Sequence, residues 1–450
     1  MNTPVFPDDP RAALARAIGV AAFVYGYPLV ESMRTCRLQT TGPERAPIDA
    51  LYHYKRPSTD VDRDVVTPAN DLLYTTAWIQ LCDGPRLLRV PAAARHPGRY
   101  FVLALYDAYT ENFENLGPRN CSADGETVVL LGPRTQVPEG LAHLKQVRCP
   151  TDLVWLVGRV LVADEPDLPA ARVLQQEIAL ECVSGTTPGG APLAVREWAG
   201  EPVDAMAELH ERGRPAAEVA PRFFTSLVQA LADAPGRVED QGMVAWFGQA
   251  GLLGGAAFRW DALEPAQRAG LTVGLAEASA LVAKVARSRR ARPWVLASRA
   301  GRYGSDYLTR ALTAYIGLGA LATSEAIYGA GHFDADAQPL DGRRDYTLRF
   351  APGQLPPVDA FWSVTLYDAD RFLYRNPLQR HAIGDRTRGL KHDADGGLTL
   401  HFSHRAPADM ANWMPAPAGP FYLILRLYHP REEVRGWKAP ALQAQTPAAA

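Results

Sequence analysis

The chain has 450 residues, of which 47% are hydrophobic and 21% charged, and its formal net charge is −2. This length predicts two or three domains with ordinary cores. The near-neutral charge argues against a nucleic-acid or anionic-membrane partner, because both require a basic face. Five scattered cysteines without a Cys-x-x-Cys pair, and an N-terminus without a basic signal segment, predict a cytoplasmic protein with free thiols.

The first predicted element is a helix within residues 1–40. Asp9 and Pro10 suit its start, because an Asp caps the first turn and a Pro fits the first helical position. Apolar side chains then recur at helical spacing, at Leu14, Ile18, Ala22, Tyr25 and Leu29. We expect Pro28 to kink this helix, because proline removes one backbone hydrogen bond.

Residues 41–167 have a different texture, with short apolar runs separated by Gly, Pro and Asp. Strands are predicted at 73–81, 87–90, 100–106, 127–131 and 153–162. Regular short strands without long helices between them favour a sandwich over an alternating α/β sheet.

A helical domain is predicted over residues 168–330, with helices at 170–179, 219–233 and 266–285. Strands return in residues 331–440, at 346–350, 361–367, 398–402 and 421–428. The tail at 441–450 is rich in Ala, Pro and Gln, and we expect it to be disordered. The predicted organisation is therefore β, then α, then β.

The tetrapeptide Leu-Tyr-Asp-Ala occurs twice, at Leu105–Ala108 and Leu366–Ala369, each time at the end of an aromatic-led apolar run. This repeat predicts two β-domains with a related hairpin. Neighbouring residues on a strand point to opposite faces, so the Tyr and Asp of each copy do not share a pocket. An Asp at a strand end more often closes a turn through the backbone, and we interpret Asp107 and Asp368 in that way.

Several blocks together resemble a known family. Residues 67–78 and 84–91 resemble its N-terminal signature, and residues 352–368, 383–386 and 412–417 resemble its C-terminal signature. The family is the bacterial one that pairs the domains of unknown function numbers 1254 and 1214. The resemblance implies an immunoglobulin-like sandwich at 41–167, a jelly-roll sandwich at 331–440 and helices between them. It implies no activity, because function depends on the site rather than the fold.

The family pattern is not matched everywhere. This chain has Ala69 and Leu72 in the N-terminal block, and His381 where a Tyr is usual.

The strongest candidate for chemistry is Asn70-Asp71, followed by Tyr74, in a polar loop before a predicted strand. Functional groups concentrate on loops that a rigid sheet holds in place, although an Asx turn that starts the strand would use the same residues. We expect an enzyme, a hydrolase or lyase without a nucleotide cofactor, that acts on a small polar or anionic molecule in a cleft between the sandwiches. Asp71 would be the general base and Tyr74 the proton donor.

The connection 376–388 is the second candidate, because a long loop in a compact domain is more often functional or self-packed than idle. Arg386 would bind an anionic substrate group, and Asn376 would orient the substrate. The alternative is an ion-pair network around Asp385 that folds the loop on itself.

Two other hypotheses remain open. A non-catalytic saccharide- or metabolite-binding protein would use Tyr374 and Trp413, which lie in polar, loop-like segments, as exposed aromatic contacts. A structural module would assemble through exposed edge strands, and a homo-oligomer would form in this way.

No Gly-x-Ser-x-Gly, P-loop or Gly-x-Gly-x-x-Gly pattern occurs in its required context, so no nucleotide cofactor is expected. His401 and His404 are three apart on a predicted strand and face opposite sides, so no metal is expected either.

Overall fold

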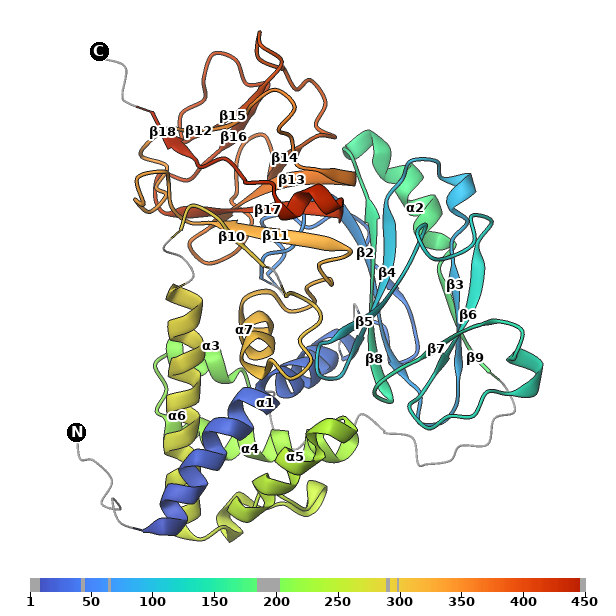
Figure 1. The fold of residues 1–450 in the computed structure, drawn as a ribbon, viewed down its shortest axis with the longest axis vertical. Helices are drawn as coiled ribbons and strands as arrows, with labels where there is room; N and C mark the ends of the chain where they lie inside the picture. The colour runs from blue at the N-terminus through green and yellow to red at the C-terminus, as the bar shows by residue number, and fades with distance from the viewer. Residues whose placement is uncertain are drawn as a thin grey trace.

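The computed structural model describes residues 9–41, 45–63, 66–183, 203–288, 292–297 and 299–445. Figure 1 shows two regions of β-sheet, the C-terminal one at the top and the N-terminal one at the right, above and beside a group of helices. Each region contains one five-stranded and one four-stranded sheet, and we use the word sandwich only as a name for this pair of sheets. This mixed architecture confirms the predicted order of β, α and β elements.

The N-terminal sandwich consists of two sheets around a shared apolar core. Its five-stranded sheet has the order β1 (Tyr52–His53), β2 (Leu72–Gln80), β8 (Leu153–Leu161), β4 (Phe101–Asp107) and β5 (Asn112–Leu116). Its four-stranded sheet has the order β7 (Lys145–Arg148), β6 (Glu126–Leu131), β3 (Arg86–Val90) and β9 (Ala179–Cys182).

The C-terminal sandwich has the same plan around its own core. Its five-stranded sheet has the order β10 (Val295–Leu296), β11 (Ala326–Gly331), β17 (Phe421–Pro430), β13 (Val358–Asp368) and β14 (Ala382–Gly384). Its four-stranded sheet has the order β16 (Trp413–Pro415), β15 (Leu398–Ser403), β12 (Tyr346–Phe350) and β18 (Gln443–Ala444).

The two sandwiches have the same strand order. Each strand of the first sandwich corresponds to the strand of the second whose number is higher by nine, so that β1 corresponds to β10 and β8 to β17. The one parallel pairing of the first sandwich, between β6 and β7, recurs in the second between β15 and β16. Strand order therefore does not separate an immunoglobulin-like type from a jelly-roll type, and that assignment stays a prediction.

The repeated Leu-Tyr-Asp-Ala forms the same turn in both sandwiches. A side-chain oxygen of Asp107 accepts backbone N–H bonds from the residues two and four positions ahead, at 2.9 Å each. Asp368 does the same at 3.0 Å each. Three residues after each Asp the backbone is left-handed, with φ of 70° at Thr110 and 73° at Arg371. The turn-closing role predicted for both Asp residues is confirmed.

The described residues form seven α-helices: α1 (Pro10–Thr40), α2 (Leu168–Gln176), α3 (Ala205–His210), α4 (Ala216–Asp233), α5 (Gln241–Phe247), α6 (Pro265–Ser288) and α7 (Tyr307–Gly317). Most of them pack around α1 and cover part of the outward face of the five-stranded sheet of the N-terminal sandwich. Helix α1 continues through Pro28, where a kink was expected, to Thr40.

Helices α1 and α6 approach each other closely through glycines. A Cβ added to Gly274 would lie 2.4 Å from the Arg16 carbonyl oxygen, so a larger residue would push the helices apart. By length and composition alone both helices could cross a membrane, although 61% of the most apolar stretch of α1 and 50% of that of α6 are buried inside the protein.

The long predicted strands and helices are confirmed within a few residues, and the shorter strands were missed. Strands β9, β10 and β11 lie within the predicted helical domain but complete the two sandwiches. The tail was predicted to be disordered, but its strand β18 pairs with β12 and forms an edge of the four-stranded sheet. Residues 446–450 of that tail lie outside the described part of the chain.

Candidate functional site

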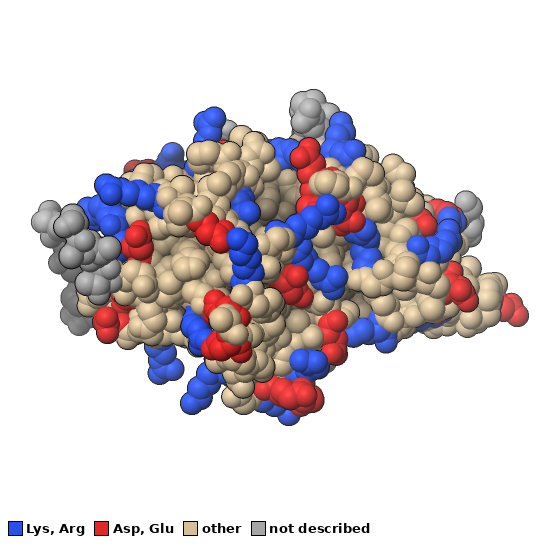
Figure 2. Space-filling view, turned by 90° about the horizontal axis from the view of Figure 1, so that it is seen from above, with Lys and Arg blue, Asp and Glu red and all other residues tan. Residues whose placement is uncertain are grey.

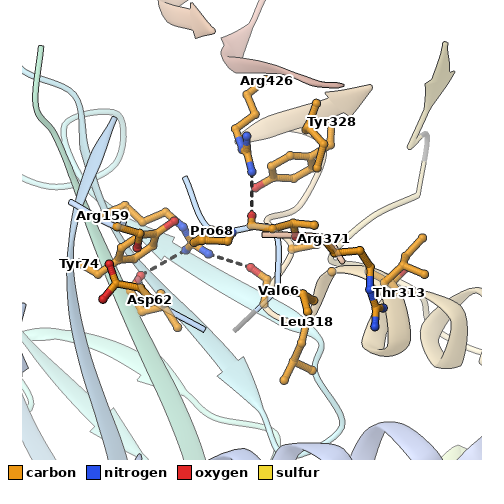
Figure 3. Close-up of a pocket in the computed structure, with 18 of the residues that line it drawn as sticks. Asp62, Val66, Pro68, Tyr74, Arg159, Thr313, Leu318, Tyr328, Arg371 and Arg426 are labelled. Carbon is orange, nitrogen blue, oxygen red and sulfur yellow. Dashed lines mark hydrogen bonds between the residues drawn. The ribbon is translucent and has the colours of Figure 1, made fainter. Parts of the chain in front are cut away.

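A cavity of about 1200 Å³ lies between the two five-stranded sheets, with the end of α7 and the loop after α1 beside it. Each sheet contributes its outward face, the side that does not pack into its own sandwich core. The apolar part of the lining includes Trp155 and Val157 of β8 and Ile424 of β17. Figure 3 shows residues of both sheets converging on this space.

Arg159, near the end of β8, is buried in the cavity wall, with 7% of its surface exposed. Its guanidinium donates to the Gly319 carbonyl at 2.7 Å, and to the Tyr106 hydroxyl and the Val157 carbonyl at 3.3 Å each. The guanidinium carbon also lies 5.8 Å from the centre of the Tyr74 ring. All of these partners are neutral.

Arg426, on β17, is buried in the opposite wall, with 4% of its surface exposed. It donates to the Thr365 hydroxyl at 2.8 Å, to the Thr67 carbonyl at 2.9 Å and to the Tyr367 hydroxyl at 2.7 Å. Tyr367 in turn donates to the Pro68 carbonyl at 2.6 Å. These partners are again neutral.

Neither guanidinium has a carboxylate within 4.0 Å among the residues that the structure describes. Burial opposes the charge of Arg159, but the surrounding tyrosines, Tyr106 first, favour it, and its pKa stays above the usual value. The pKa of Arg426 is raised against the same opposition by burial, through Tyr367, Tyr428 and then Asp71. Asp71 therefore acts on Arg426 only from beyond ion-pair distance, and neither positive charge in the cavity wall has an acid of the described residues in direct contact.

The remaining charged residues of the lining do not neutralise them. Asp62 is the one acid of the described lining, and it forms a two-armed ion pair with Arg56 at 2.6 and 3.0 Å. Arg371 pairs with Glu211 at 2.5 Å. On the outer face in Figure 2, by contrast, basic and acidic side chains are intermixed. The excess of positive charge is thus a property of the cavity, in a chain whose net charge is −2.

The tyrosines around the two arginines are hydrogen-bond donors rather than bases. Burial raises the pKa of Tyr367 to about 12, although Arg426 lowers it. Burial also raises the pKa of Tyr106 and of Tyr328. At neutral pH these hydroxyls keep their protons, so they cannot abstract a proton. Tyr106 and Tyr367 already donate their single proton to the Gly319 and Pro68 carbonyls, whereas Tyr328 accepts the Leu321 N–H and can donate its own proton to an anion.

The structure places the predicted Asn70-Asp71-Tyr74 group at the start of β2. Tyr74 lines the cavity, and its hydroxyl accepts the Ala69 N–H at 3.2 Å. The Asp71 carboxylate oxygens are buried and accept no hydrogen bond from a described residue, but Asp71 is not part of the cavity lining. The Asn70 amide donates to the Ser58 carbonyl at 2.7 Å. The sequence therefore located one cavity residue and its immediate surroundings.

The four candidates of the C-terminal sandwich do not line the cavity. Asn376 is 7% exposed and holds its own loop, donating to the Tyr374 carbonyl at 3.1 Å and accepting the Arg380 N–H at 3.1 Å. Arg386 donates to the Ala360 carbonyl at 3.0 Å on the surface. This agrees with a loop folded on itself.

Trp413 is 5% exposed, which excludes the exposed aromatic platform that was expected of it. It lies in β16, and its indole donates to the Ser403 hydroxyl at 2.9 Å. Tyr374 is partly buried and packs against the core of the same sandwich. The polar residues that flank Trp413 in the sequence form turns on either side of a short strand. For this reason the sequence indicated a loop residue, although Trp413 belongs to the core.

The two residues that sequence reasoning missed are Arg159 and Arg426. Both stand inside apolar strand runs, Leu-Val-Trp-Leu-Val-Gly-Arg-Val-Leu and Phe-Tyr-Leu-Ile-Leu-Arg-Leu-Tyr. A charge inside an apolar run of a central strand is costly to bury and is rare without a partner or a role. That rarity was the available signal.

No group of three or more His, Cys, Asp or Glu side chains in the described residues could hold a metal ion. None of the five cysteines, all of which lie in the described part of the chain, forms a disulfide.

The fold and the site define a protein of two like sandwiches that close on a basic cavity. Residues 48–182 match DUF1254 and residues 325–432 match DUF1214, both described as protein of unknown function. The chain belongs to the family that pairs these two domains. The comparison with curated proteins gives no match.

Two solved structures resemble the chain. The VPA0106 protein from Vibrio parahaemolyticus is 23% identical, with a TM-score of 0.68 over 96% of this chain and 100% of its own, which shows a common fold. An uncharacterized protein from Burkholderia cenocepacia is 15% identical, with a TM-score of 0.47 over 98% of this chain and 90% of its own.

Proposed function

We propose that this protein binds a small anionic organic molecule in the cavity between its two sandwiches. The observation that carries the proposal is the pair of buried arginines, Arg159 and Arg426, whose described partners are all neutral. A buried cation without an acid in ion-pair contact is costly, and an anionic ligand supplies that contact. The apolar and aromatic side chains beside them, such as Trp155 and Ile424, suit an organic body rather than an inorganic ion.

A thermal-shift screen tests this proposal with carboxylates and their uncharged amides, for example benzoate against benzamide and hexanoate against hexanamide. The carboxylates are expected to raise the melting temperature and the amides to leave it unchanged, because ligand bound only to the folded state stabilises it. Arg159→Met and Arg426→Met should each weaken the response. Equal responses to acids and amides, or equal responses of wild type and both variants, would rule the anion site out.

A cofactor-independent hydrolase or lyase that acts on the same ligand is a second candidate. The Asp71 carboxylate favours it, since both oxygens are buried and accept no hydrogen bond from a described residue. Asp71 precedes the strand that carries the cavity residue Tyr74, so a modest movement of this segment would bring a base to the ligand. Asp71→Asn is then expected to abolish turnover of a ligand found in the screen while leaving its affinity intact. Unchanged turnover would exclude Asp71 as the base.

A further inference from the structure

The two cavity arginines occupy equivalent positions in the two sandwiches. Arg159 of β8 is paired across the sheet with Tyr74 of β2, and Arg426 of β17 is paired with Tyr328 of β11. Strands β8 and β17 hold the same place in their sheets, as do β2 and β11. Each arginine therefore stands beside a tyrosine of the neighbouring strand at the same register.

A second tyrosine repeats with them. Tyr106 of β4 lies opposite the residue four positions before Arg159, and Tyr367 of β13 lies opposite the residue four positions before Arg426. These are the tyrosines of the two Leu-Tyr-Asp-Ala copies, and each shares a hydrogen bond with its arginine. We call Tyr74, Arg159 and Tyr106 the first Tyr–Arg–Tyr set, and Tyr328, Arg426 and Tyr367 the second.

The carbonyl that holds each arginine comes from the other half of the chain. Gly319, in the segment that leads to β11 of the C-terminal sandwich, accepts from Arg159 and from Tyr106, both at 2.7 Å. Thr67, in the segment that leads to β2 of the N-terminal sandwich, accepts from Arg426 at 2.9 Å. Each set thus has its own tyrosines and its own carbonyl acceptor.

The two sets face the same cavity from opposite sheets, and each has an apolar surface beside its arginine. Figure 3 shows Arg159 and Tyr74 entering from one sheet, and Arg426 and Tyr328 entering from the other. On each central strand the residue two positions before the arginine is apolar and also lines the cavity, Val157 in β8 and Ile424 in β17. Each of the two opposite walls therefore presents one cation with an apolar side chain beside it.

We propose that the cavity holds two anion subsites, one at each Tyr–Arg–Tyr set, and that its ligand is a small organic dianion of the dicarboxylate class. Each end of the ligand would be bound by one arginine, and its apolar middle would lie against Val157 and Ile424. This inference rests on the anion site proposed above and adds the number of charges and their placement. Neither cation has an acid of the described residues in ion-pair contact, so each can bind one carboxylate of the ligand directly.

Isothermal titration calorimetry on the full chain tests the proposal with succinate, adipate and suberate and with the matched monoacids butyrate, hexanoate and octanoate. The affinity of the diacids is expected to peak at one chain length and to exceed that of the matched monoacid by roughly ten- to a hundredfold, the value of one further charged hydrogen-bonded contact. Arg159→Met and Arg426→Met should each remove this advantage, while a monoacid still binds at the intact subsite. Arg349→Met, which removes a charge from the outer sheet of the C-terminal sandwich, should change neither series.

The possible failures are distinct. If one arginine variant abolishes the binding of monoacids and diacids alike and the other has no effect, a single anion site exists, so the proposed function stands and the two-subsite inference falls. If neither series binds the wild type, both fall. Arg159→Lys and Arg426→Lys keep the charge and serve where a Met variant does not fold. Each should weaken diacids more than monoacids, and equal weakening would overturn the inference.

Discussion

Replacing Arg159 by methionine is expected to leave the ligand-free protein as stable as the wild type, whereas the equivalent change at Arg426 is expected to destabilise it. The difference follows from what each arginine leaves behind. The Gly319 carbonyl keeps the Tyr106 hydroxyl as a donor at 2.7 Å when Arg159 is removed. Among the described residues, the Thr67 carbonyl accepts its hydrogen bond from Arg426, so this carbonyl is left unpaired when Arg426 is removed.

The magnitudes come from opposing terms. Burying a cation costs several kcal/mol, and each hydrogen bond from a charged donor returns about 1.5–3 kcal/mol. Arg159 makes one short bond, at 2.7 Å, and two long ones, at 3.3 Å. These terms nearly cancel, so Arg159→Met should change the free energy of unfolding by less than about 1 kcal/mol. Arg426→Met should lower it by about 1–3 kcal/mol, the penalty for an unpaired buried carbonyl.

Urea unfolding of the ligand-free protein, followed by tryptophan fluorescence and circular dichroism, measures both values. Arg349→Met serves as the control, because its side chain is 46% exposed and its ion pairs lie on the surface. A loss of more than about 3 kcal/mol for Arg159→Met would refute the reasoning, since a loss of that size is typical of breaking a buried ion pair. Such a result would mean that the charge is already balanced and is not available to a ligand.

Other changes test the rest of the structure. Burial raises the pKa of Asp107 from 3.8 to about 7, so the folded state holds a proton that the unfolded state has lost, and stability falls as pH rises between these values. Asp107→Asn keeps an oxygen for the turn and should remove this fall, at most about 4 kcal/mol, in urea unfolding at several pH values. Asp368→Asn, in the equivalent but partly exposed turn, is the control, and an equal effect there would contradict burial as the cause. Trp413→Ala should lower the free energy of unfolding by about 3–5 kcal/mol without changing carboxylate affinity in calorimetry, and a selective loss of affinity would restore its predicted role. Asn376→Ala should cost about 1–3 kcal/mol in the same unfolding assay, and no change would show that its loop hydrogen bonds are unimportant.

The sequence was most informative where the chain repeats a pattern. The two Leu-Tyr-Asp-Ala copies correctly indicated equivalent hairpins, because a Tyr facing one side of a strand and an Asp closing the turn leave a recognisable signature. The short strands escaped prediction: β1, β10 and β18 have two residues each. Such strands carry no alternation to detect, and pairing with a neighbour determines them.

The site was only partly predictable for a related reason. Tyr74 was found because it follows a polar loop, but Asn376 and Trp413 have polar neighbours that serve the packing of their own sandwich. Arg159 and Arg426 become a pair only when the two sheets face each other, and they lie 267 positions apart in the chain. No local pattern records a contact of that kind.

Each arginine donates to a carbonyl from the other half of the chain, Arg159 to Gly319 and Arg426 to Thr67. The two halves of this single polypeptide therefore contact each other as the two subunits of a two-fold symmetric dimer do. In a homodimer with an isologous interface, a substitution appears in both subunits at once. Here the two walls are encoded separately and already differ, with Trp155 in β8 where β17 has Tyr422, and Thr76 in β2 where β11 has Ala330. In a single chain of this kind, one wall of the cavity can change its side chains while the other wall is left as it is, which is impossible in a symmetric dimer.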